Sequence, residues 1–88
     1  MTVRIHPHAI GRMKERGCTR AEVEYAVRHG SRSPAQFDRT GFKHTFAYNR
    51  RWLGKLYRRK SVEAYAVDES PGEGEEDWLV VTVIVKHF

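Results

Sequence analysis

Apolar residues recur at helical spacing in the first third of the chain, which predicts two consecutive α-helices. The first helix is expected at about residues 7–16, because Pro7 suits the first helical position and Gly17 favours a C-terminal stop. The second is expected at about residues 19–29, because Thr19 begins a Thr-x-x-Glu capping box. Both helices place their apolar positions on one side, so each should pack on a neighbouring element.

From about residue 31 the pattern changes from helical to alternating, which is typical of β-strands. The last segment is almost continuously apolar, as expected for a central strand that is covered on both faces. The run of Glu, Asp, Gly and Pro before it cannot bury apolar surface and predicts an exposed loop at 69–77. Strands are expected at about residues 34–37, 42–49, 55–67 and 78–87.

The order of these elements predicts an α+β fold. Two N-terminal helices are expected to pack on one face of a mainly antiparallel sheet of about four strands. A chain of 88 residues with 40% hydrophobic composition can form one modest core, so residues 1–88 are expected to make a single domain. The second face of the sheet is then free to bind a ligand.

Charge is divided unevenly along the chain, although the formal net charge is only +5. Residues 1–60 hold 15 of the 16 Lys and Arg but only four of the 11 acidic residues. Clustered cations bind polyanions by releasing counterions from a phosphate backbone, so this distribution favours RNA as a partner. The alternative is that the basic charge serves only solubility.

The remaining composition bears on the cellular compartment of the protein and on whether it binds a metal or another cofactor. Cys18 is the only cysteine, so no intrachain disulfide can form, and the lack of an apolar leader adds to an expectation of a cytoplasmic protein. The apolar run at 78–85 is too short to cross a bilayer, so no membrane contact is expected. No zinc-type spacing of His and Cys occurs, and nothing in the sequence calls for a metal or another cofactor.

His8, Arg12 and Arg16 follow one another at helical spacing, so the first helix would line them along one face. The positive end of the helix dipole opposes protonation of His8, which favours a neutral ring that can accept a proton. Two guanidinium groups beside that ring can hold a phosphate. The alternative interpretation is an ordinary amphipathic helix with solvated charges.

The segment at 48–59 mixes aromatic and cationic residues. Such a mixture suits the stacking of unpaired bases together with contacts to backbone phosphates. It equally fits a hairpin that covers a small core, and the sequence does not choose between the two. The residues expected to contact nucleic acid are Lys14, Arg50, Arg51, Trp52, Tyr57, Arg58 and Arg59.

Four parts of the chain together resemble a bacterial family of small domains of unknown function. They are the motif H-A-x-x-R-M-x-x-R-G at 8–17, the capped second helix, the segment W-L-G-K-L-Y-R-R-K-S-V at 52–62 and the closing W-L-V-V-T-V-I-V. That family is similar to the toxin superfamily that groups barnase, EndoU, colicin-type and RelE-like ribonucleases. The resemblance implies N-terminal helices packed on an antiparallel sheet, and a metal-independent endoribonuclease of toxin type.

The resemblance also implies roles for individual residues. His8 would act as the general acid or base, and Arg12 and Arg16 would clamp the phosphate. Lys60 would add electrostatic stabilisation, and Thr82 would bind the phosphate or position the histidine. The simpler interpretations are a core hydroxyl for Thr82 and a solvated strand cation for Lys60.

A second general acid or base is not evident in the sequence, although His44 and His87 are available. The alternative class of function is a non-catalytic module that binds RNA, or an acidic protein such as a cognate antitoxin, through the same basic face. Such a module needs the positive charge without needing His8. A single cleft that joins His8, Arg12 and Thr82 would favour the enzyme, and dispersed side chains would favour the binding module.

Overall fold

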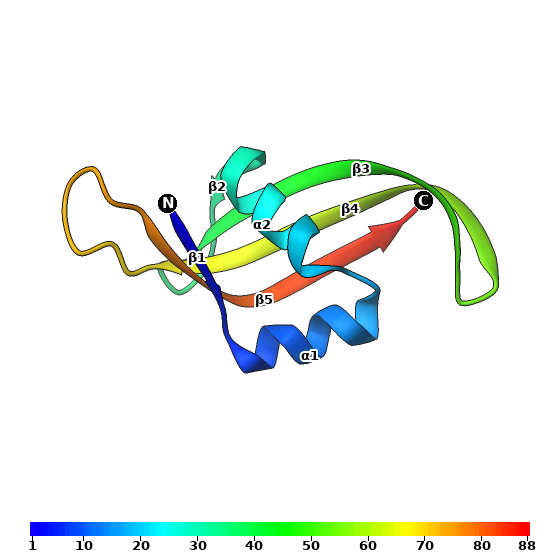
Figure 1. Cartoon of the computed structure of the whole chain (residues 1–88), viewed down its shortest axis with the longest axis horizontal. Coiled ribbons are helices and arrows are strands. Elements are labelled where there is room, and N and C mark those ends of the chain that lie inside the picture. Colours follow the sequence, from blue (N-terminus) through cyan, green and yellow to red (C-terminus); the bar gives the residue numbers. More distant parts are fainter.

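The computed structural model describes all 88 residues and has an α+β fold with two helices, which confirms the predicted class. The helices pack on one face of a five-stranded sheet (Figure 1). In chain order the elements are β1 (Thr2–Ile5), α1 (Pro7–Arg16), α2 (Arg20–His29), β2 (Ser31–Pro34), β3 (Thr40–Trp52), β4 (Lys55–Asp68) and β5 (Asp77–His87).

The strands are arranged in the order β1-β5-β4-β3-β2. Strands β2 to β5 pair antiparallel, but β1 runs parallel to β5, so the sheet is mixed. The prediction of about four strands was wrong because it missed β1. This strand has only four residues, with Val3 and Ile5 buried, and so short an alternation gives little signal.

Two other strand predictions differ from the structure. β2 lies at 31–34 instead of about 34–37. The residues after it cannot extend it, because Phe37 and Asp38 have φ angles of 60° and 55°. β3 continues beyond its predicted end at Asn49, since a register shift between Ala47 and Arg50 takes up the positive φ of Asn49 and pairing with β4 resumes.

Local sequence signals account for the helix ends. The His6 ring caps the N-terminus of α1, and Gly17 ends the helix with a φ of 75°. A Cβ at Gly17 would lie 2.8 Å from the Trp52 ring, so both the backbone angle and the close packing require glycine. The capping box of α2 is complete, because Thr19 and Glu22 each accept a hydrogen bond from the other residue's backbone N–H.

The core lies between the helices and one face of the sheet. Its largest fully buried side chains are Phe42, Val23, Val27, Val62, Val80 and Val83. Because side chains alternate along a strand, the residues between these on β4 and β5 point to the opposite face, called here the open face, which no helix covers. β5 is therefore not a strand covered on both faces, and its Ile84 side chain is 41% exposed.

The molecule is elongated, with extents of 45 × 22 × 22 Å, and its two ends carry opposite charge. The β3–β4 hairpin forms one end and the acidic segment between β4 and β5 forms the other (Figure 1).

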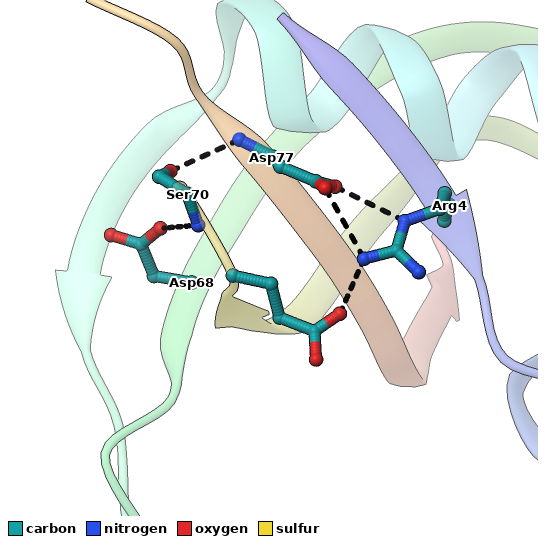
Figure 2. A network of polar contacts seen from close by, with 5 residues as sticks. Arg4, Asp68, Ser70 and Asp77 are labelled. Atoms are coloured by element: carbon teal, nitrogen blue, oxygen red, sulfur yellow. Dashed lines mark hydrogen bonds and ion pairs between the residues drawn. The ribbon is translucent and has the colours of Figure 1, made fainter. Parts of the chain in front are cut away.

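The acidic charges are partly neutralised within the protein. The Arg4 guanidinium of β1 donates to both carboxylate oxygens of Asp77, at 3.1 and 3.3 Å, and pairs with Glu69. Ser70 extends this network, because its N–H donates to Asp68 and its hydroxyl accepts from the Asp77 N–H (Figure 2). The acidic end is thus tied to β1, instead of being solvated throughout.

Candidate nucleic-acid interface

Lys60 is almost fully buried, with 4% of its surface exposed, so its interpretation as a solvated strand cation is wrong. Its Nζ donates to the carbonyl oxygen of Gly17 at 3.0 Å and lies 2.8 Å from Oε1 of Glu22. The ammonium group also lies 4.7 Å from the centre of the Tyr48 ring, close enough for a cation–π contact. Lys60 therefore ties β4 to the α1–α2 junction, and its charge is used inside the protein.

The same ion pair acts on the protonation of its neighbours. Burial raises the pKa of Glu22, but hydrogen bonds from Lys60 and Thr19 outweigh burial, so this pKa lies below its ordinary value. Burial, reinforced by the Glu22 charge, raises the pKa of the Cys18 thiol to about 12. The thiol is therefore protonated at neutral pH and is no nucleophile.

His8 and Arg12 lie next to each other on the outer side of α1. They line a shallow hollow of about 300 Å³ together with Pro7, Gly11 and Glu15. The Arg12 guanidinium pairs with the Glu15 carboxylate at 3.0 Å. Both side chains of this pair are well exposed, so the interaction is weak and a phosphate group can displace it.

Arg16 and Thr82 lie in two other places. The Arg16 guanidinium donates to the Val83 carbonyl, at the edge of β5 that β1 leaves free. Thr82 lines a hollow on the open face together with Glu63 and Tyr65. The five residues implied to be catalytic are therefore dispersed, and no single cleft holds them.

The β3–β4 hairpin carries the largest group of unpaired positive charges. No acidic residue occurs between Thr40 and Val62. The exposed cations of the hairpin, none of which forms an ion pair, are Arg50, Arg51, Lys55, Arg58 and Arg59. Lys14, in the last turn of α1, is also exposed and unpaired, whereas Arg4 and Arg32 pair with carboxylates at the acidic end. The hairpin cations are thus available to a partner.

The aromatic residues of the hairpin pack around one another and are only partly exposed. The rings of Tyr48, Trp52 and Tyr57 surround the ring of His87, at centre-to-centre distances of 5.2, 5.2 and 5.5 Å. Trp52 stacks on His87 with an angle of 11° between the ring planes, and it also contacts Gly17 at the end of α1. This cluster holds the hairpin against α1, so its rings serve packing while the cations between them face solvent.

His87 lies at the centre of this cluster, and its Nε2 is buried without a hydrogen-bond partner. Burial, and then the nearby Lys60 charge, lower the pKa of His87 against the opposing effect of Glu22, so the ring is neutral at pH 7. The sequence signal for this position was weak. The alternation of β5 places His87 on the same face as Val83 and Val85, and only the register shows that it lies opposite Lys60.

No family model, curated protein or solved structure matches this chain. Neither helix has the length and apolar character that a membrane span requires. No group of three or more His, Cys, Asp or Glu side chains is positioned to hold a metal ion. The charge and geometry of the hairpin and of the open face are therefore the basis for inferring function.

Replacing Lys60 tests the buried ion pair. We expect Lys60→Met to lower the free energy of unfolding by about 3 kcal/mol, because Glu22 loses its partner while it is still largely buried. The double variant Lys60→Met/Glu22→Gln should recover part of this loss, since no charge is left unpaired and the Gln amide oxygen can still accept from the Thr19 N–H. Urea unfolding followed by tryptophan fluorescence measures both. Lys86→Met, at an exposed position, is the control and should change stability by less than about 0.5 kcal/mol.

The neutral His87 ring makes stability depend on pH. The pKa of His87 is lower in the folded protein than in the unfolded chain. The contribution of the neutral ring to the free energy of unfolding is therefore complete above about pH 6.5 and is lost as the pH falls below that value. We expect the free energy of unfolding to decrease from pH 7 to pH 5, and His87→Phe to flatten this dependence. His29→Phe, at an exposed histidine, should keep it. If the free energy of unfolding of His87→Phe depends on pH as steeply as that of the parent protein, His87 is not the source of the dependence.

Proposed function

We propose that this protein binds unpaired RNA through the exposed cations of the β3–β4 hairpin, called here the hairpin surface. The observation that carries the proposal is that Arg50, Arg51, Lys55, Arg58 and Arg59 are all exposed and lack an acidic partner. A phosphate backbone supplies the regularly spaced negative charge that such a surface matches. RNA is also the polyanion that the motif at 8–17 suggests, because the small family that the chain resembles is similar to ribonuclease toxins.

Apolar side chains on the hairpin surface favour an unpaired strand over a duplex. Leu53 is 85% exposed and Leu56 is 62% exposed, and both lie among the cations. Unpaired bases can be splayed onto apolar side chains, whereas the bases of a duplex stack on one another. The acidic segment at the other end of the molecule repels phosphate. The charge distribution therefore also orients the protein on the RNA, with the hairpin toward the phosphates and the acidic segment away from them.

Metal-independent RNA cleavage is the second candidate, and the adjacency of His8 and Arg12 in one hollow favours it. An imidazole beside a guanidinium group can move a proton while the cation stabilises negative charge on the phosphate. The separate positions of Arg16 and Thr82 weigh against a larger catalytic centre, so RNA binding is the primary proposal. An acidic protein such as an antitoxin is the alternative partner of the same cations.

Salt dependence tests the hairpin surface. We expect affinity for a labelled single-stranded RNA to fall steeply between about 50 and 200 mM salt, as measured by fluorescence anisotropy. Arg50→Gln/Arg51→Gln should lower the affinity about tenfold at low salt and reduce the slope of log K against log salt by roughly one to two. Arg20→Gln/Arg28→Gln on α2 removes the same charge and should change much less. Affinity that does not respond to salt would contradict a phosphate-binding surface.

Incubation with RNA tests the second candidate. If His8 is a general acid or base, the protein should cleave RNA in the presence of a chelator, and His8→Ala should slow cleavage by about 10² to 10⁴ while RNA affinity stays nearly unchanged. Denaturing gels of the reaction products measure this. His29→Ala, at an exposed histidine of α2, is the matched control. Cleavage at the parental rate by His8→Ala would remove His8 from the mechanism.

A further inference from the structure

The open face of the sheet contains a hollow of about 420 Å³ beside the loop that joins β2 and β3. Its volume is within the range of about 300–1,000 Å³ that is usual for sites of small ligands. Tyr65 and Thr82, which pair in register on β4 and β5, line it from the sheet, and Phe37 and Arg39 line it from the loop. Gly41, which pairs in register with Tyr65 on β4, adds no side chain next to the Tyr65 ring.

The loop side of the hollow offers an aromatic ring and a cation. Phe37 is 82% exposed and adopts a φ of 60°, a backbone conformation that is rare for a bulky residue and that occurs preferentially at functional sites. The Arg39 guanidinium lies 5.7 Å from the centre of the Phe37 ring and forms no ion pair. An exposed ring beside a free cation suits a planar ligand that carries a negative group.

The sheet side of the hollow offers a hydrogen-bond acceptor. The Tyr65 hydroxyl donates to Oε1 of Glu63 at 2.7 Å, which fixes the carboxylate and leaves its Oε2 free to accept another hydrogen bond. A carboxylate only accepts, so it pairs with an amino group of a base, as in the contact of Glu with cytosine. Uracil fits poorly, because carbonyl oxygens flank its single N–H and are repelled by the carboxylate.

We propose that this hollow is a subsite for one unpaired nucleobase with an exocyclic amino group, within an RNA strand that the hairpin surface binds. The inference rests on the proposed RNA-binding function. The base would stack on Phe37 and Tyr65 and donate to Glu63, and its phosphate would contact Arg39.

Exposed cations on the open face form a path along which an RNA strand can run from the hollow to the hairpin surface. Lys43 pairs in register with Glu63, Lys86 pairs with Ser61, and Arg59 lies two residues before Ser61 on β4, so all three cations point to the open face. Each of them is exposed, and none forms an ion pair. A backbone that follows these cations leads from the hollow to the end of the hairpin.

Short oligouridylates that carry one central A, C, G or U test the subsite by fluorescence anisotropy. We expect the oligonucleotides with a central A, C or G to bind about fivefold tighter than oligouridylate itself. Glu63→Gln should abolish this difference and strengthen oligouridylate binding, because an amide donates to a uracil carbonyl and accepts from its N–H. Glu73→Gln, in the acidic segment, makes the same charge change and should keep the difference. Phe37→Ser, at an exposed position, should weaken all four complexes roughly tenfold.

The outcomes separate the subsite from the proposed function. Salt-dependent binding that is equal for all four oligonucleotides, with Glu63→Gln identical to Glu73→Gln, would overturn the subsite and leave the hairpin surface intact. The absence of any salt-dependent binding to the parent protein would overturn the proposed function itself. A preference for amino-bearing bases that survives in Glu63→Gln would also contradict the role of the carboxylate.

Discussion

The buried ammonium group of Lys60 is the interaction on which the arrangement of this protein depends. An isolated cation in a core is strongly unfavourable, and here it is offset by an ion pair with Glu22, a hydrogen bond to the Gly17 carbonyl and the face of the Tyr48 ring. These partners come from α2, from the α1–α2 junction and from β3. Through these contacts the Lys60 charge joins α2, the α1–α2 junction and β3 to β4, where Lys60 itself lies.

This constraint determines which surfaces remain available for binding. With both helices held on one face, the opposite face of the sheet is uncovered, and the Trp52–His87 stack fixes the hairpin against the end of α1. The hairpin cations are therefore presented on a rigid element, which lowers the entropy that binding must overcome. At the acidic end, Arg4 and Arg32 neutralise carboxylates. Intramolecular pairing thus neutralises part of the acidic end, whereas the cations of the hairpin stay unpaired.

Local signals in the sequence were enough to predict the α+β class, but not the pairing of the strands or the environment of single residues. The capping box at Thr19 and the alternation along β4 act over a few residues, so they can be read without a structure. Strand β1 is stabilised by its parallel register with β5, a partner more than 70 residues away that no local pattern reveals. The same limit explains Lys60 and His87. A strand lysine is expected in solvent, and only the cross-strand register shows that the buried Lys60 lies opposite the partly buried His87.

If unpaired RNA lies along the hairpin surface and the open face, an NMR titration will identify the residues that it contacts. In ¹H–¹⁵N spectra recorded with a short single-stranded RNA at low salt, we expect shifts for residues 50–59, Lys43, Lys86 and the loop at 35–39. Resonances of the solvent-facing side of α2 and of the acidic segment at 71–76 should stay in place. Shifts confined to α1, or to the acidic segment, would show that RNA does not bind along the hairpin surface and the open face.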